Sequence, residues 1–159
     1  MEWIFELPKE LSVIIVGMLP VFELRGAIPL GFFLEMPLAK TFILAFLGNL
    51  IPVIPLYFLL QPISIRLSRL PLFRVFFNWL FSHTKKRAEI IQRYEALGLV
   101  LFVAIPLPIT GAWTGTIAAS LFRIKFKYTF WAVTLGVFIA GVIVTALCLL
   151  GKLGWGIIR

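Results

Sequence analysis

The stretch LSVIIVGMLPVFELRGAIPLGFFL, residues 11–34, is long enough to cross a bilayer, but its centre is poorly suited to a continuous helix. Crossing the hydrocarbon core takes roughly 20 apolar residues in a helix. Pro20, Gly26, Pro29 and Gly31 interrupt this stretch, and it carries Glu23 and Arg25 in its middle. Proline removes a backbone donor and clashes with the preceding turn, and glycine adds backbone entropy. We therefore predict two half-helices joined by an unwound tip, a re-entrant hairpin that enters and leaves the membrane by one face.

Three further apolar blocks follow the first one. The four blocks repeat one order twice: an interrupted block and then an uninterrupted one. Residues 41–65 are a run of 25 without a charge, and residues 128–150 are an uncharged run of 23. Between these runs, residues 66–95 are basic, and residues 96–122 are uncharged but interrupted by Pro106, Pro108, Gly111 and Gly115. The two clean runs are long enough to span a bilayer. Each broken block is thus followed by a predicted spanning helix.

Composition places the whole chain in lipid. Of its 159 residues 61% are hydrophobic and 14% are charged, whereas about a quarter of the residues of a soluble domain are charged. The length suits one domain. We predict an all-α integral membrane protein with a single membrane domain, residues 1–159. It would divide into repeat one (11–65), a basic amphipathic linker (66–95) and repeat two (96–150).

Loop charges favour re-entrant hairpins over four full spans. The linker carries seven basic and two acidic residues, and the loop at residues 123–127 adds three basic residues, which together account for the net charge of +8. Re-entrant blocks would put both segments on one face of the membrane, and full spans would put them on opposite faces. The positive-inside rule favours the first arrangement and makes that face cytoplasmic. We expect a multi-pass protein of the cytoplasmic membrane with both segments inside the cell.

A weak internal repeat supports this order. A shift of 88 residues makes eight of 44 aligned positions identical, including Leu19-Pro20 with Leu107-Pro108, Thr41-Phe42 with Thr129-Phe130, and Leu47-Gly48 with Leu135-Gly136. A re-entrant hairpin plus one span crosses the membrane an odd number of times, so the second copy is inverted relative to the first. Inverted repeats with discontinuous helices are the architecture of many secondary transporters, whose sites lie where the broken segments meet.

Polar residues inside the apolar blocks are the first candidates for a binding site. A charge near the bilayer centre costs about 2.5–3.5 kcal/mol on insertion scales, so Glu23 and Arg25 are expected to face a cavity or a partner. Beside Gly26 at an unwound tip, they would have backbone amides nearby to bind a ligand. Alternatively, the two charges neutralise each other or tie down the hairpin. Asn49, in the middle of residues 41–65, could contact a ligand or bond to a neighbouring helix.

The second tip lacks charge but is rich in hydrogen-bonding groups. It offers the hydroxyls of Thr110 and Thr114, the indole of Trp113 and the backbone of Gly111, which the shift of 88 pairs with Glu23. We expect the first hairpin to supply charge and the second to supply hydrogen bonds and an aromatic face for substrate or proton binding. Alternatively, the small residues only permit close helix packing.

Several other classes of function are disfavoured by the same composition. The chain has one cysteine, one histidine and no aspartate, so we expect no disulfide, no metal site and no cofactor. Without a visible nucleophile–base pair we do not expect an enzyme. Basic loops of a membrane protein account for the positive charge, so nucleic acid is not an expected partner.

Four segments, ELRGAIPLG (23–31), LGNLIPV (47–53), VAIPLPITGAWTGT (103–116) and LGVFIAGV (135–142), resemble the small multi-drug export protein family. That family in turn resembles the DedA (VTT, SNARE-associated) superfamily, which has two re-entrant hairpins in an inverted repeat. DedA proteins are implicated in moving polyprenyl-phosphate carriers or phospholipids across membranes with dependence on the proton-motive force. They place acidic and arginine residues in both hairpins. The second hairpin here has neither, so the resemblance carries over only Glu23 and Arg25.

The residues and the resemblance together lead us to expect a small membrane transporter. It would move an anionic lipid carrier, a phospholipid or a small amphiphile across the cytoplasmic membrane, with Arg25 holding the anionic group and Glu23 exchanging a proton. A small-molecule or multidrug exporter is one alternative, and a non-transporting membrane scaffold or assembly factor is another. Membrane lipids are the expected partners, and a homodimer would complete a transport path for so short a chain.

Overall fold

The structure, a computed structural model, describes residues 7–67, 88–107 and 110–157, and every regular element in these ranges is an α-helix. This confirms the all-α prediction for the described residues. In chain order the helices are α2 (Lys9–Met18), α3 (Glu23–Phe33), α4 (Leu38–Leu50), α5 (Val53–Leu67), α7 (Ala88–Ala104), α8 (Ala112–Leu121) and α9 (Phe126–Ile157).

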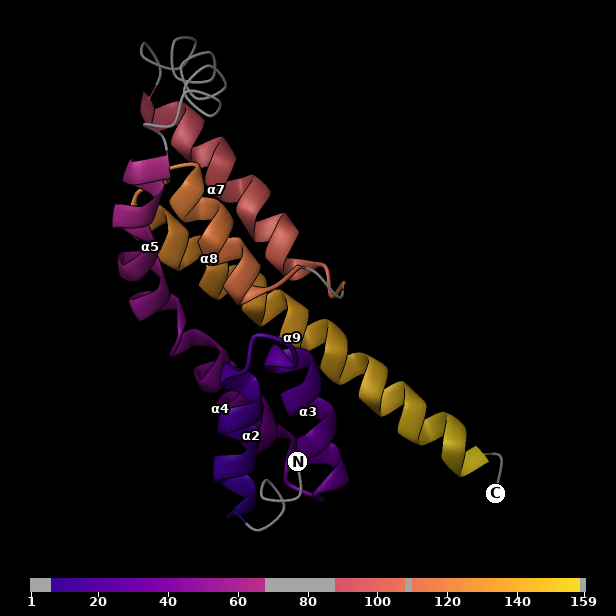
Figure 1. Cartoon of the computed structure of the whole chain (residues 1–159). Coiled ribbons are helices and arrows are strands. Elements are labelled where there is room, and N and C mark those ends of the chain that lie inside the picture. The colour runs from indigo at the N-terminus through magenta and orange to yellow at the C-terminus, as the bar shows by residue number, and fades with distance from the viewer. Residues whose placement is uncertain (1–6, 68–87, 108–109, 158–159) are drawn as a thin grey trace.

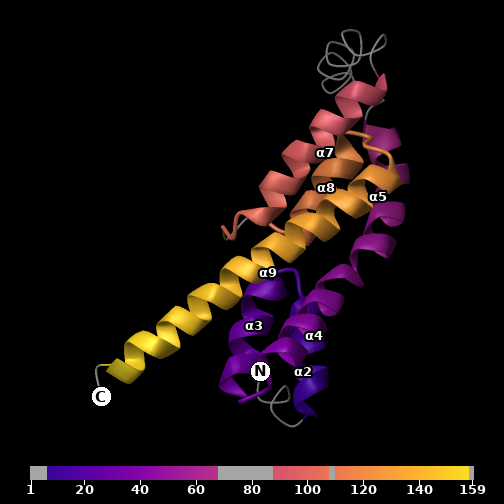
Figure 2. The same ribbon diagram turned by 180° about the vertical axis from the view of Figure 1, so that it is seen from behind.

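The helices form two groups at opposite ends of an elongated molecule. Helices α2, α3 and α4 lie at one end, α5, α7 and α8 lie at the other, and α9 runs diagonally past both groups (Figures 1 and 2). The turn between α2 and α3 and the turn between α7 and α8 both lie near the middle of the molecule (Figure 1). Each turn belongs to a helical hairpin whose outer ends lie at the end of the molecule occupied by its own group.

The first hairpin breaks where the sequence predicts a tip, but the break is shorter than expected. Helix α2 ends at Met18, α3 begins at Glu23, and the turn between them contains Pro20. Pro29 was expected to contribute to the unwound tip, yet it lies inside α3. Its ring is exposed on the helix surface, so the missing backbone donor interrupts a single bond of the helix without burying an unpaired group. The tip is thus confined to residues 19–22.

The second helix of each hairpin ends in the same way. Glu35 has a positive φ of 57°, and Arg123 has a positive φ of 56°. At the first site the amides of Glu35 and Met36 donate to Phe32 and Gly31, and the corresponding amides after α8 donate to Ser120 and Ala119. This pair of hydrogen bonds is a Schellman motif, in which a residue with left-handed backbone ends the helix. Shifted by 88 residues, Glu35 falls on Arg123, and the starts of α4 and α9 also coincide.

The two clean runs form the helices that are long and apolar enough to cross a membrane. The candidate spans are Leu38–Leu60, of 23 residues, and Phe126–Lys152, of 27 residues. The first is interrupted between α4 and α5, where Pro52 lies buried. Proline cannot continue the hydrogen-bond ladder of a helix, which accounts for the interruption.

Glycine lets each hairpin pack closely on its spanning helix. A Cβ on Gly48 of α4 would lie 2.5 Å from the carbonyl oxygen of Ile14, and one on Gly136 of α9 would lie 2.7 Å from Cβ of Val103. Small residues at helix contacts are the usual means of packing in membranes, because lipid supplies little hydrophobic drive between helices. Gly48 and Gly136 are also 88 residues apart.

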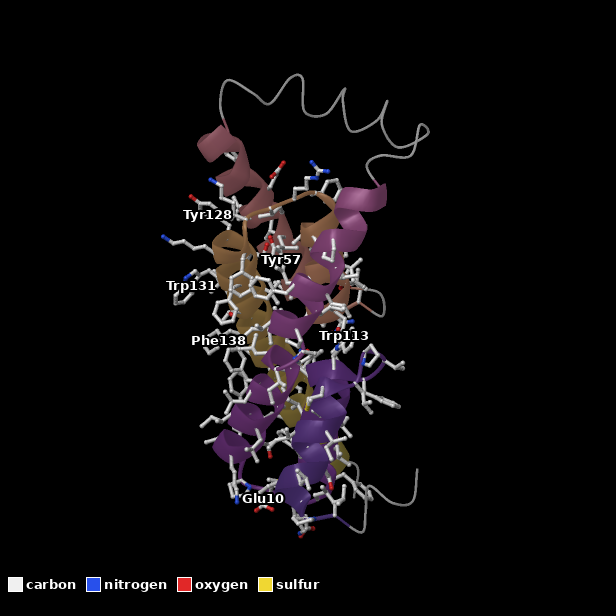
Figure 3. All side chains as sticks on the ribbon, turned by 60° about the vertical axis from the view of Figure 1, so that its left-hand side comes forward. Glu10, Tyr57, Trp113, Tyr128, Trp131 and Phe138 are labelled. Carbon is white, nitrogen blue, oxygen red and sulfur yellow. The ribbon has the colours of Figure 1, made fainter. Side chains whose placement is uncertain are left out.

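One buried hydrogen bond joins the two halves of the chain near the end occupied by α5 and α8. The hydroxyl of Tyr57 on α5 donates to the carbonyl oxygen of Ile124 over 2.7 Å. Figure 3 places Tyr57 toward that end, with Trp113 about midway along the molecule and Glu10 at the far end. Most of the predicted basic amphipathic linker (66–95) lies outside the described residues, although α7 already begins at Ala88 within it.

Candidate functional site

Glu23 lies at the centre of the contact between the two hairpin tips. It opens α3 with a positive φ of 50° and is only 7% exposed. A left-handed backbone costs a residue with a side chain about 1–2 kcal/mol, and such strain is concentrated at functional sites. The conformation directs a carboxylate from the first hairpin to the second, where its Oε1 accepts a hydrogen bond of 3.1 Å from the amide of Trp113.

The partner of this carboxylate is the N-terminus of helix α8. The donor, the amide of Trp113, belongs to the first turn of this helix. The first turn of a helix leaves amides unpaired and carries partial positive charge, and it therefore binds anions. Here the anion is a side chain from the other half of the chain. The same amides would bind a phosphate or carboxylate ligand in its place.

Gly111 gives the carboxylate the room to approach. Its φ of 175° is extended backbone open to any residue, so the need for glycine is steric. A Cβ at this position would lie 2.5 Å from Cδ of Glu23 and 2.6 Å from its Oε1. The shift of 88 residues pairs these two residues in the sequence, and the structure puts them in contact.

Arg25 reaches the second tip beside Glu23. Its Nη2 donates to Oγ1 of Thr110 over 3.2 Å. The Thr110 hydroxyl in turn donates to the carbonyl of Ile105 over 2.5 Å and so fixes the second turn. Among the described residues the ion pair within 4 Å joins Lys40 with Glu10. Glu23 and Arg25 therefore do not pair directly, and the half-buried guanidinium keeps donors available for an anion.

Trp113 ties the two tips together with both of its N–H groups. Its amide binds Glu23, and its indole Nε1 donates over 3.1 Å to the carbonyl of Met18, the last residue of α2. Figure 3 shows this side chain where the group of α2 and α3 meets the second hairpin. The C-terminal carbonyls of a helix lack partners within it, so the indole satisfies one of them. The sequence did not indicate Met18, because a backbone carbonyl leaves no signal in residue type.

A small cavity lies between the tips and the helices that follow them. Its volume is ≈ 10 Å³, and it is lined by Glu23, Leu24, Arg25, Asn49, Val103, Gly111, Ala112, Val137 and Ala140. Asn49 is 2% exposed, and its Oδ1 has no hydrogen-bond partner. A space of this size holds about one water molecule. The cavity thus has room for about one water molecule and not for a larger solute.

Four of the sequence candidates do not line this cavity: Thr110 and Trp113 join the two tips, whereas Gly26 and Thr114 contact their own hairpins. Gly26 packs against Phe22, the residue that precedes α3. A Cβ added at Gly26 would lie 2.7 Å from Cβ of Phe22. The hydroxyl of Thr114 donates over 3.4 Å to the carbonyl of Gly111 within its own first turn. The structure therefore gathers Glu23, Arg25, Thr110, Gly111 and Trp113 at the tips and places Asn49 on the cavity wall.

The described residues contain no cluster of three or more histidine, cysteine, aspartate or glutamate side chains that could hold a metal ion. At the centre of the molecule, the Glu23 carboxylate accepts a hydrogen bond from a backbone amide, and the Arg25 guanidinium donates one to a hydroxyl. Two helices that are long and apolar enough to cross a membrane, together with the apolar composition, indicate a membrane protein.

Its family follows from the sequence match. Residues 23–143 match the family described as "Putative small multi-drug export protein", and the chain belongs to this family. The match begins at Glu23, directly after the first tip, and includes α3, the second tip and the first part of α9. No curated protein and no solved structure matches the chain.

Proposed function

We propose that this family member is a transporter in which two hairpins enter the bilayer from opposite faces and close on an anion site near its middle. The observation that carries the proposal is the carboxylate of Glu23 bound at the N-terminus of α8, beside the guanidinium of Arg25. A helix N-terminus and an arginine together form a site for an anion. In the closed state the protein's own carboxylate fills that site.

Helix lengths support re-entrant hairpins. Helices α2 and α3 have 10 and 11 residues, and α8 has 10. At 1.5 Å per residue each is about 15 Å long, roughly half of the hydrocarbon core. The starts of α2 and α4 lie at one end of the molecule, and the starts of α7 and α9 lie at the other (Figure 1). Tips entering from the two faces would then meet near the midplane.

Contacts between equivalent positions support an inverted repeat. A residue on a two-fold axis touches its own counterpart, and Glu23 touches Gly111, which is 88 residues away. The residues that line the cavity include two more pairs of equivalent positions, Leu24 with Ala112 and Asn49 with Val137. A pseudo-two-fold axis through the tips accounts for all three pairs. The repeats would then be two gates that move about one site.

Competition between Glu23 and a bound anion gives a mechanism for proton coupling. Ionised, the Glu23 carboxylate occupies the α8 amides, and an anionic group is excluded by charge and by space. Protonation removes the charge that holds the side chain there, so the amides and Arg25 become available to an anionic headgroup. The hairpins must also part, because the present cavity has room for about one water. Lower pH on the loading side would therefore favour substrate binding.

The substrate class follows from this chemistry and from the resemblance to DedA proteins. An anionic phospholipid or a polyprenyl-phosphate carrier has the headgroup for the tip and the tails for lipid. The membrane would be the cytoplasmic one, with the basic end of the molecule inside the cell. The chain would have no enzymatic activity of its own. The family description favours export of small drug-like molecules as the second candidate function.

Transbilayer movement of a fluorescent anionic phospholipid tests the proposal. Proteoliposomes containing nitrobenzoxadiazole-labelled phosphatidylglycerol would be treated with external dithionite, and the exchange rate measured at pH 5.5 and pH 7.5. The intact protein should speed exchange more at the lower pH. Glu23→Gln should remove most of the pH dependence, and Arg25→Ala should slow exchange by about tenfold, as expected for loss of a charge-assisted bond.

Two controls decide the interpretation. Glu35→Gln removes an exposed carboxylate at the other end of α3 and should behave like the unaltered protein. Labelled phosphatidylcholine, which is zwitterionic, should exchange more slowly than the anionic probe. Exchange no faster than in protein-free liposomes, or unchanged in the Arg25→Ala protein, would rule out anionic lipid at this tip. Ethidium flux in the same vesicles would then favour the exporter.

A further inference from the structure

A second, larger opening lies between α7 and α8, away from the hairpin tips. The groove has a volume of ≈ 360 Å³ and is lined on the α7 side by Glu95, Gly98 and Phe102, and on the α8 side by Ala118 and Phe122. The two helices lie next to each other at the end of the molecule that they share with α5 (Figures 1 and 2). Pockets for small molecules have volumes of about 300–1,000 Å³, so a drug-sized ligand fits this groove.

Glu95 is the one ionisable residue that lines this groove, and the other lining residues are apolar. Its side chain is half-buried, and no ion pair joins it to a cation among the described side chains. A carboxylate in apolar surroundings is unfavourable unless a cation or donor approaches it. The groove thus presents one negative charge on an otherwise apolar surface.

This combination selects a ligand by charge and by surface. A cation with an apolar body would bury that body against the groove and place its charge near Glu95. The rings of Phe102 and Phe122 add aromatic faces that attract cations. An anion of the same size would bury the same apolar area but would be repelled by the carboxylate. A neutral acyl chain would leave the carboxylate without a partner.

We propose that the α7–α8 groove binds a cationic amphiphile, with Glu95 holding the charge and the apolar walls holding the body. The site differs from the Glu23–Arg25 site in position and in the sign of its ligand. It therefore does not depend on the transport function proposed above.

Binding of tetraphenylphosphonium to the purified protein in a non-ionic maltoside detergent tests this site. Equilibrium dialysis against protein-free micelles would separate specific binding from partition into detergent. The unaltered protein should bind the cation saturably, and Glu95→Gln should weaken binding by at least about tenfold. Tetraphenylborate, an anion of nearly the same shape measured alone, should bind more weakly than the cation.

Gly98→Leu provides a second variant that blocks the groove by volume. A Cβ built at Gly98 meets nothing within 4 Å, so the new side chain can enter the groove without displacing the fold. It should abolish binding, whereas Glu35→Gln should leave it unchanged. Thermal unfolding of each variant would confirm that it is folded. Equal binding of the two ions, unaltered binding by Glu95→Gln, or no binding by the unaltered protein would overturn the proposal.

Discussion

Gly111 and Gly98 show how differently two glycines of one hairpin depend on their surroundings. A Cβ at Gly111 would overlap the Glu23 carboxylate, whereas a Cβ at Gly98 would meet open space. The first glycine is required for the contact between tips. The second lies inside α7, where glycine weakens a helix by its backbone entropy.

Alanine at these two positions should therefore act in opposite directions. Gly111→Ala should lower the free energy of unfolding by about 1–3 kcal/mol, the range for overpacking. Gly98→Ala should raise it by about 0.5–1 kcal/mol through helix propensity. Unfolding of both variants in the same detergent, followed by circular dichroism, measures the pair. A Gly111→Ala protein as stable as the parent would mean that the Glu23 carboxylate does not occupy the space above Gly111.

Schellman motifs at the ends of α3 and α8 define the hairpins at the scale of elements. Both motifs place a residue with a side chain in the left-handed region, Glu35 in one and Arg123 in the other. Glycine adopts that conformation without steric cost. These motifs fix where each hairpin ends and each spanning helix begins.

Glu35→Gly should stabilise the protein, because it removes the steric cost of a Cβ at a left-handed position. The expected gain in unfolding free energy is about 0.5–1 kcal/mol, after the greater unfolded-state entropy of glycine is subtracted. Glu35→Ala retains the Cβ and should give no such gain. Chemical unfolding of the three proteins compares them directly. A gain with alanine equal to that with glycine would show that the carboxylate, and not the backbone, is responsible.

The ion pair between Glu10 and Lys40 joins the starts of α2 and α4. The hydrogen bond from Lys40 holds the pKa of Glu10 below its ordinary value of 4.5. A lowered folded-state pKa means that the pair favours the folded state above the unfolded-state pKa. That contribution is lost as the pH falls through the folded-state value.

Lys40→Met should raise the pKa of Glu10 back toward its ordinary value, since the main cause of the lowering is removed. Carbon NMR of the Glu10 carboxyl during an acid titration measures the shift. The Lys125→Met protein is a matched control, because that lysine lies at the opposite end of the molecule. A Glu10 titration unaffected by Lys40→Met would show that the pair does not persist in the membrane.

At the scale of the whole molecule, the positions of the loops distinguish two hairpins from four full spans. With re-entrant hairpins, the loop after α3 and the loop after α8 face opposite sides of the membrane. Four full spans would put these two loops on the same side. The structure has them at opposite ends of the molecule (Figure 1).

Cysteine labelling in cells checks this arrangement. In a Cys148→Ala background, Glu35→Cys and Lys125→Cys place one thiol in each loop. A membrane-impermeant maleimide should label Glu35→Cys in intact cells and Lys125→Cys only after the cells are opened. Labelling of both thiols from the same side would support four full spans and contradict the proposed closure of the tips near the midplane.

The sequence by itself determined where the chain is broken and where it is continuous. Proline interrupts a helix locally, and the length of an uncharged run decides whether it can span a membrane. The tips and the two candidate spans could therefore be predicted. It also identified Glu23 and Gly111 as counterparts by the shift of 88. Pro29 was misplaced because an exposed proline can remain in a helix when the rest of that helix packs well.

Only the tertiary structure decided which of these residues meet. It placed the Glu23 carboxylate on the amide of Trp113 at the start of α8, left Thr114 and Gly26 outside the cavity, and formed a groove beside Glu95 that no motif indicated. Contacts between residues about 90 positions apart depend on how whole helices pack. Local residue chemistry sets the breaks in a chain, but the approach of one helix end to another is set by the summed packing of all the helices between them.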